Sequence, residues 1–187
     1  MGDARNYTEP NLAVIERCKK GDRTAFQELY NLYAKAMFNI SLRILNDRNE
    51  AEEVLQDSFL KVFSKINSYD QTFAFGAWLK RIVINASLDV LKKRKVNFVS
   101  LDEARYDSDE EVEEDDSVYE AEILKKCINE LPDGFRAVLT LFVFEEQSHK
   151  EIAALLNISE GTSKSQYNRA KKKLIELVKL NTVNHER

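Results

Sequence analysis

The sequence predicts an all-α fold made of two small helical domains that an acidic flexible linker joins. Apolar residues recur every three or four positions through most of the chain, a spacing that places them on one face of a helix. Glycine and proline, which break helices, number only 5 and 2 among 187 residues. Between Asn97 and Asp116 this periodicity disappears. We therefore expect one domain over residues 11–95, a linker over 96–116, and a second domain over 117–180 that contains a helix-turn-helix.

The first domain is predicted to be a bundle of three helices. Thr24 with Gln27, and Asp47 with Glu50, have the spacing of a capping box at a helix start. Apolar stripes follow both, consisting of Phe26, Tyr30, Tyr33, Met37, Ile40 and Ile44, and then of Ala51, Leu55, Phe59, Val62 and Ile66. A polar, turn-like stretch over 67–72 separates them from a third helix, expected from about Ala74 to Lys95. Its inner face would hold Leu79, Val83, Ala86 and Val90. Three such helices can bury one another's apolar faces.

The net charge of −4 hides an uneven distribution along the chain. The segment Asp102–Asp116 holds 10 acidic residues and one arginine, whereas the whole chain has 32 acidic and 28 basic residues. The remainder, with 22 acidic and 27 basic residues, therefore has a net charge of +5. Like charges repel, so the acidic segment should be extended and flexible. The basic remainder is compatible with nucleic-acid binding despite the acidic isoelectric point.

The second domain is predicted to be a series of shorter helices. Ser117 and Glu120 fit a capping box, and the helix they begin should end at Pro132. Its apolar face would consist of Ala121, Leu124, Ile128 and Leu131. A short helix is expected over 134–144. Another, capped by Ser148 and Glu151, should run to Leu156, and a final helix should cover about 160–180.

The stretch Ser148–Lys173 has the features of a helix-turn-helix. Ala153 is small enough for two helices to cross there, and Asn157 tolerates the left-handed backbone of a tight turn. Ser159 can cap the following helix, whose N-terminal end would enter the major groove of DNA. The side chains placed to reach base edges or phosphates are Lys164, Ser165, Gln166, Asn168, Arg169 and Lys172. The alternative is a helical hairpin with a solvated basic face.

Several other classes of function are disfavoured. The two histidines and two cysteines do not form a zinc-binding set, so we expect no metal and no cofactor. Residues 1–98 contain no histidine, no glycine-rich phosphate loop and no recognisable nucleophile–base pair, which argues against an enzyme. No apolar run reaches the roughly 18 residues of a membrane span. The segment Met1–Glu9 has no apolar core, and Cys18 and Cys127 do not suggest a disulfide framework, so we expect a cytoplasmic protein.

Three motifs, in order along the chain, resemble the extracytoplasmic-function group of bacterial RNA polymerase sigma factors. The first is Ala51–Lys61, which is similar to the polymerase-binding helix of that family. The second is Phe75–Asn85, which resembles its promoter-melting helix. The third combines Leu131–Arg136 with Ser148–Ala153 and Gly161–Ser165, close to the family wording LP…R, S-x-x-EIA and GTVKSR. Two departures are Ser163, where the family has an apolar residue, and Gln166, where it has arginine. They imply a looser recognition helix or fewer phosphate contacts.

The resemblance implies a specificity subunit that binds core RNA polymerase and promoter DNA. The helix-turn-helix would read the −35 element as duplex, and the first domain would read the −10 element and trap its non-template single strand. The residues implied in the second task are Lys61, Tyr69, Asp70, Gln71, Thr72, Lys80, Arg81 and Asn85. Those implied in polymerase binding are Glu52, Glu53, Gln56 and Asp57. Phe75 and Trp78 are expected to be core aromatics.

Two questions stay open at the level of the sequence. A stand-alone helix-turn-helix regulator would explain the second domain, although it leaves the first without a role. The acidic linker either keeps the domains apart or occupies a basic nucleic-acid channel of the polymerase, as the linker does in the family. An anti-sigma factor is a common partner in the family, but no residue of this chain identifies one.

Overall fold

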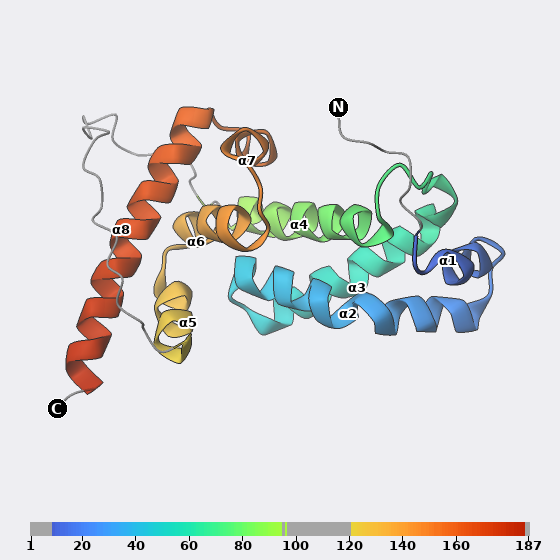
Figure 1. Ribbon diagram of the computed structural model, residues 1–187, viewed down its shortest axis with the longest axis horizontal. Helices are drawn as coiled ribbons and strands as arrows, with labels where there is room; N and C mark the ends of the chain where they lie inside the picture. The colour runs from blue at the N-terminus through green and yellow to red at the C-terminus, as the bar shows by residue number, and fades with distance from the viewer. Residues whose placement is uncertain (1–8, 95, 97–120, 186–187) are drawn as a thin grey trace. The chain divides into compact units, whose positions relative to one another are not determined.

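The computed structural model describes residues 9–94, 96 and 121–185, and all of its regular elements are helices (Figure 1). The chain divides into two compact units, with the boundary between Val90 and Leu91. Each unit is described by itself below. The predicted linker over 97–116 and the predicted cap formed by Ser117 and Glu120 lie outside the described residues. Within the described ranges, no helix combines the length and the apolar character that crossing a membrane requires.

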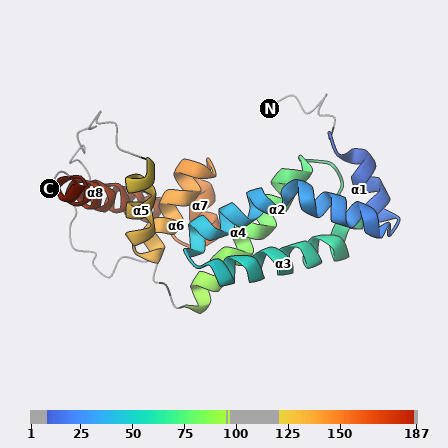
Figure 2. The ribbon, with the colours of Figure 1, turned by 90° about the horizontal axis from the view of Figure 1, so that it is seen from below.

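The first unit is built from α1 (Leu12–Lys19), α2 (Arg23–Leu45), α3 (Arg48–Lys65) and all but the last three residues of α4 (Phe75–Lys93). A single 3-10 turn, η1 (Ile66–Ser68), follows α3. Figures 1 and 2 show α2, α3 and α4 lying along one another, as expected for a bundle. The short helix α1 was not predicted as a separate element. It packs against the first half of α2 through Ile15 and Cys18, which are both buried.

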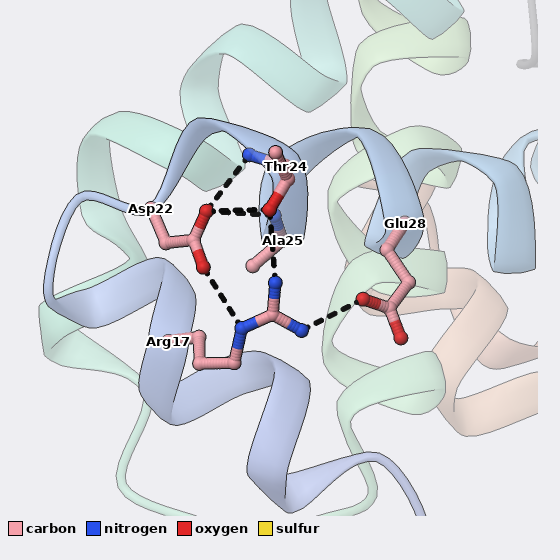
Figure 3. A network of polar contacts seen from close by, with 5 residues as sticks. All are labelled: Arg17, Asp22, Thr24, Ala25 and Glu28. Atoms are coloured by element: carbon pink, nitrogen blue, oxygen red, sulfur yellow. Dashed lines mark hydrogen bonds and ion pairs between the residues drawn. The ribbon is translucent and has the colours of Figure 1, made fainter.

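The start of α2 differs from the sequence-based prediction. Asp22, not Thr24, is the N-cap: its carboxylate accepts hydrogen bonds from the backbone N–H groups of Thr24 (2.9 Å) and Ala25 (3.3 Å). The predicted Thr24–Gln27 capping box is therefore wrong, because the helix begins one residue before Thr24. Figure 3 shows Arg17 of α1 completing this cap by bonding Asp22 (2.8 Å) and Glu28 (2.9 Å). Hydrogen bonds from the Thr24 hydroxyl and from Arg17 lower the pKa of Asp22 to about 2.

The predicted stripes supply much of the core of the first unit, although Ala86 and Val90, predicted for the inner face of α4, are only half-buried. Met37, Ile40 and Ile44 of α2 are buried, and Phe59 and Val62 of α3 are buried as well. The aromatic residues nearer the start of α2 pair with α3, with ring centroids 4.6 Å apart for Phe26–Phe63 and 4.7 Å apart for Tyr30–Phe59. One polar contact lies inside this core, where the Ser87 hydroxyl of α4 donates to Ser41 of α2 at 3.0 Å. Small hydroxyl side chains thus let α2 and α4 approach closely without leaving a polar atom unsatisfied.

The second unit contains α5 (Ala121–Glu130), α6 (Asp133–Leu139), a π-helical turn η2 (Thr140–Phe144), α7 (His149–Leu156) and α8 (Glu160–His185). Figure 1 shows α5, α6 and α7 distributed along the length of α8, and all three pack against it. The predicted stop at Pro132 is correct, and Pro132 forms the N-cap of α6. The last helix extends five residues beyond the predicted end at Leu180.

Arg136 joins α6 to the end of α5. Its side chain is buried, with 2% exposure. The guanidinium donates to the carbonyl oxygens of Leu131 (2.6 Å) and Asn129 (3.5 Å) and forms an ion pair with Asp133. The last carbonyl groups of a helix have no partner within the helix. A buried arginine therefore satisfies the C-terminal end of α5 and fixes the turn around Pro132.

Candidate nucleic-acid interface

Helices α7 and α8 form the predicted helix-turn-helix. The Ser148 hydroxyl accepts from the backbone N–H of Glu151 (3.3 Å), and the Glu151 carboxylate accepts from the backbone N–H of Ser148 (2.8 Å), which confirms the capping box. Asn157 has a φ of 56° and a ψ of 49°, the predicted left-handed conformation. The Ser159 hydroxyl accepts from the backbone N–H of Thr162 at 2.9 Å and so caps the start of α8. Ala153 is buried where the two helices meet.

A polar contact that the sequence did not predict holds the two helices together. His149 Nδ1 of α7 lies 3.0 Å from the Ser163 hydroxyl of α8, and Ser163 is fully buried. The imidazole ring stacks on Phe142, with ring centroids 4.5 Å apart. Burial, reinforced by the charge of Lys164, lowers the pKa of His149. Ser163, which departs from the family pattern, thus has a specific partner, and the expected loosening of α8 does not follow from it.

The predicted base and phosphate contacts differ in how accessible they are. Lys164, Asn168 and Lys172 are exposed and spaced four residues apart, which places them along one face of α8. Ser165 and Arg169 form a half-buried row beside them. Lys164 forms an ion pair with Glu160 at 2.8 Å, but both side chains are about half exposed, so the pair is readily exchanged for a DNA contact.

Gln166 lies in a different environment from the other predicted contacts on α8. Its side chain is only 4% exposed, and it faces the interior of the second unit. A residue in this position has little surface to offer a base. Its place in the sequence, two residues from Lys164 and three from Arg169, gave no sign of that burial, because neighbouring positions on a helix point in different directions.

The loop between η1 and α4 holds several of the residues predicted to contact the −10 element. Asp70, Gln71 and Thr72 are exposed, and the Asp70 carboxylate accepts from the backbone N–H of Thr72 at 3.0 Å. That hydrogen bond lowers the pKa of Asp70. Gln71 has a φ of 63°, and the ring of Phe73 is 68% exposed. The loop therefore displays a turn of polar groups next to an aromatic face.

Tyr69, in contrast, supports the loop from inside. Its side chain is 3% exposed, and its hydroxyl donates to the carbonyl oxygen of Phe73 at 2.8 Å. The ring packs against Phe75 and Trp78, with centroid distances of 5.3 and 5.4 Å. Phe75 is fully buried and Trp78 partly buried, so both are core aromatics as expected. Tyr69 is therefore buried, unlike Asp70, Gln71 and Thr72, which were predicted with it to contact the −10 element.

Cationic and amide groups lie on α3 and α4. Lys61 is exposed near the end of α3. On α4, Arg81 and Asn85 are exposed and one helical turn apart, so they share a face, whereas Lys80 is half-buried. The arrangement offers positive charge and hydrogen-bonding groups along the helix that follows the loop, which suits a nucleic-acid backbone.

The outer face of α3 is polar, with one exposed apolar residue beyond the last of its predicted polar contacts. Glu53, Gln56 and Asp57 are exposed, and Glu52 is half-buried and forms an ion pair with Arg48 at 2.9 Å. Leu60 follows on the same face and is 68% exposed. Leu60 was not among the residues predicted to bind the polymerase. The signal that could have identified it is its spacing, because it follows Asp57 by three residues and does not belong to the buried stripe of α3.

One unit contains a basic helix-turn-helix, and the other contains a polar loop followed by a cationic helix. These features are typical of an all-α DNA-binding protein. Family models match both units: Sigma-70 region 2 covers residues 29–96, and Sigma-70 region 4 covers residues 121–174. The chain is 30% identical over 173 residues to the ECF RNA polymerase sigma factor SigW of Bacillus subtilis, covering 86% of this chain and 92% of SigW. It is also 30% identical over 149 residues to SigM of the same organism, covering 79% of this chain and 91% of SigM.

The chain belongs to the family of ECF RNA polymerase sigma factors. The same fold is found in the sigma factor RpoE of Bartonella quintana, solved with the anti-sigma factor NepR. That match has a TM-score of 0.54 at 24% identity and covers 82% of this chain and 96% of RpoE. CnrH, solved with the cytosolic domain of CnrY, matches with a TM-score of 0.53 at 21% identity and covers 95% of this chain and 99% of CnrH. A stand-alone regulator is not favoured, because the matches extend over both units.

Proposed function

We infer that this chain binds core RNA polymerase and directs promoter-specific initiation, with each unit contacting one promoter element. The observation that carries this inference is that sigma region 2 and sigma region 4 both occur in the chain, in that order. Two DNA elements at a fixed spacing can then be recognised by one molecule. We further propose that the chain has no catalytic activity of its own and acts in the cytoplasm, where its polymerase partner is.

The second unit is proposed to read the −35 element as duplex DNA. The N-terminal part of α8 presents Lys164, Ser165, Asn168 and Arg169 to base edges, while Lys172 neutralises phosphate. Gln166 is left out of this set because it is buried. A bidentate contact to a base is worth about 1–3 kcal/mol of discrimination. Lys164 or Arg169 changed to Ala should therefore weaken −35-dependent initiation by about that amount if the residue makes such a contact.

The first unit is proposed to recognise the −10 element and hold its non-template strand once it opens. Single-strand binding requires a cationic path for the backbone and a surface on which unstacked bases can rest. Lys61, Lys80 and Arg81 supply charge, and Asn85 lies on the same face of α4 as Arg81. Asp70, Gln71 and Thr72 offer hydrogen bonds to a base, and the exposed ring of Phe73 offers a stacking face. Tyr69 is assigned a supporting role because it is buried.

The outer face of α3 is proposed to dock on a coiled coil of the largest polymerase subunit. Glu53, Gln56 and Asp57 would set the orientation through polar contacts. Leu60 would add an exposed apolar contact next to them, because burying its side chain against the polymerase removes apolar surface from water. Leu60→Ala should therefore weaken polymerase binding more than Glu53→Gln does.

Two further features of the family are proposed for this chain. RpoE and CnrH were each solved with a bound partner, an anti-sigma factor and the cytosolic domain of CnrY respectively, and we propose that this chain is regulated by a protein of the same kind. The acidic segment 102–116 is proposed to occupy a basic channel of the polymerase. Replacing its ten acidic residues by Ser and Gln should change the ratio of abortive to full-length transcripts. If neither class of transcript changes in amount, the segment acts only as a spacer between the domains.

Run-off transcription on a pool of randomised promoters tests the proposed function directly. Core bacterial RNA polymerase is assayed with and without the chain, and the templates that are transcribed are sequenced. Transcripts that depend on the chain and share two spaced DNA elements are expected. Lys164→Ala should alter the preference at the upstream element only, whereas Lys179→Ala, a matched exposed lysine further along α8, should not. Chain-independent transcription, combined with tight binding of the free chain to one duplex site, would contradict the proposal.

A further inference from the structure

A buried carboxylate at the start of the described chain is bonded to both ends of the loop before α4. Glu9 is 5% exposed, although it is charged and lies more than 60 residues away from the loop in sequence. Its Oε2 accepts a hydrogen bond from the backbone N–H of Phe75 (2.8 Å) and a longer one (3.3 Å) from the hydroxyl of Tyr69, which shares its proton with the Phe73 carbonyl at 2.8 Å. Its Oε1 accepts from the backbone N–H of Asn11 (3.3 Å). Tyr69 and Phe75 are the residues on either side of loop 70–74.

The contact with Phe75 has a clear physical reason. Phe75 is the first residue of α4, and the first N–H groups of a helix have no acceptor within it. A carboxylate at this end also interacts favourably with the helix dipole. The loop residues do not provide the acceptor for Phe75, and Glu9 supplies it from a distant segment. Buried charged groups are retained where such bonds satisfy them.

Other contacts join the same N-terminal segment to the base of the loop. The Asn11 side chain donates to the Tyr33 hydroxyl at 2.9 Å, and the Tyr33 ring packs against Phe75 with centroids 5.4 Å apart. The Lys19 ammonium lies 5.9 Å from the centroid of the Tyr69 ring. The residues at the base of the loop therefore pack against residues from the segment before α1, from α1 and from α2.

We propose that Glu9 is a positioning residue that sets how strictly loop 70–74 selects a base of the −10 element. This inference rests on the proposed function of the loop. Without the carboxylate, the Phe75 N–H loses its acceptor and the Tyr69 hydroxyl loses its longer, second contact, so the loop is held at this end by the Tyr69–Phe73 hydrogen bond without the link to Phe75. The exposed groups of Asp70, Gln71 and Thr72 would then take up more arrangements, and more than one base would fit among them.

Glu9→Ala and Glu9→Gln in the full chain, each assembled with core polymerase, test this proposal. The measurement is the affinity of the holoenzyme for single-stranded −10 oligonucleotides that carry each of the four bases at the selected position. Glu9→Ala should reduce the ratio between the best and the worst base about tenfold, which corresponds to roughly 1.4 kcal/mol. Glu9→Gln keeps an acceptor oxygen, so it should reduce this ratio by less than Glu9→Ala does. Glu28→Gln changes an exposed acidic residue of α2 that pairs with Arg17 at 2.9 Å; it is the matched control and should leave the ratio between the bases unchanged.

The same assay distinguishes failure of this proposal from failure of the function on which it rests. Gln71→Ala and Thr72→Ala alter the loop itself. If they lower base discrimination while both Glu9 variants retain it, the role of Glu9 is overturned and the loop keeps its function. If the loop variants have no effect either, both proposals fail. The Glu9 variants could also bind core polymerase more weakly and bind the oligonucleotides with all four bases equally more weakly. That result would show a purely structural role and overturn the inference.

Discussion

Replacing Arg136 by methionine should destabilise the second unit and leave the first unchanged. The guanidinium is buried and donates to the carbonyl oxygens of Leu131 and Asn129 at the end of α5. It also pairs with Asp133. Methionine has a similar length and fills irregular space well, so the substitution removes the donors with little loss of packing.

The size of the effect can be worked out from these contacts. The bond to the Leu131 carbonyl, at 2.6 Å, is the main loss, because a buried acceptor left without a donor costs about 1–3 kcal/mol. The bond to Asn129 is 3.5 Å long and adds little. Asp133 is 30% exposed and can be hydrated after the change. We expect a loss of about 1–3 kcal/mol. That is a large share of the total stability of a unit of this size, given roughly 0.05–0.15 kcal/mol per residue.

Urea unfolding of the full chain can assign the loss to one unit. The single tryptophan, Trp78, lies in the first unit, so its fluorescence follows that unit alone, whereas far-ultraviolet circular dichroism follows the helices of both. Arg136→Met should shift part of the dichroism transition to lower urea and leave the fluorescence transition in place. Lys125→Met, an exposed cation of α5, is the control. A change in the unfolding free energy below about 0.5 kcal/mol, the range of ordinary surface substitutions, would refute the reasoning.

The helix caps and the half-buried histidine, His149, give three other predictions. Hydrogen bonds lower the pKa of Asp22 to about 2, so its contribution to stability is full above pH 3.8 and is lost as the pH falls through about 2. Asp22→Asn keeps a capping side chain and should remove that pH dependence from the unfolding transition detected by Trp78. An unchanged acid profile in this variant would contradict the prediction. Burial lowers the pKa of His149, so the second unit should be fully stable above pH 6.5 and lose stability as the pH falls below that value. His149→Gln should flatten this dependence of the dichroism-detected stability. Asn157→Val should lower the stability of the second unit by about 1–2 kcal/mol, while Asn157→Gly should not lower it, and equal stabilities of these two variants would count against the left-handed turn.

Features that depend on a few neighbouring residues could be predicted from the sequence. Asp47 caps α3, Ser148 and Glu151 form a capping box, and Asn157 and Ser159 form the turn of the helix-turn-helix, because in each case the partner lies within three or four positions. The prediction at Thr24 failed because Asp22, two residues earlier, offered a competing cap. The helix α1 escaped notice because it is short and has no side-chain cap at its start.

Features that depend on residues far apart could not be predicted. The pairing of His149 with Ser163 requires the packing of two helices to be known, and an apolar residue at 163 would have suited the same helical pattern. The burial of Tyr69 and Gln166 depends on what packs over them, so a list of polar residues on a loop or helix overestimates the contact surface. The contact of Glu9 with Phe75 spans 66 positions, and no periodicity links the two.

The hydrogen bond from the Tyr69 hydroxyl to the Phe73 carbonyl has a thermodynamic consequence for the loop it closes. Ordering a residue costs about 1–2 kcal/mol in conformational entropy. If the loop binds the −10 strand as proposed, much of that cost is met during folding rather than when DNA arrives. Preorganisation of this kind lets the binding free energy reflect the contacts made with the incoming base. The chief remaining barrier is then the unstacking of the base from the duplex, a property of the promoter sequence. Differences in initiation between promoters should accordingly follow how easily their −10 steps unstack.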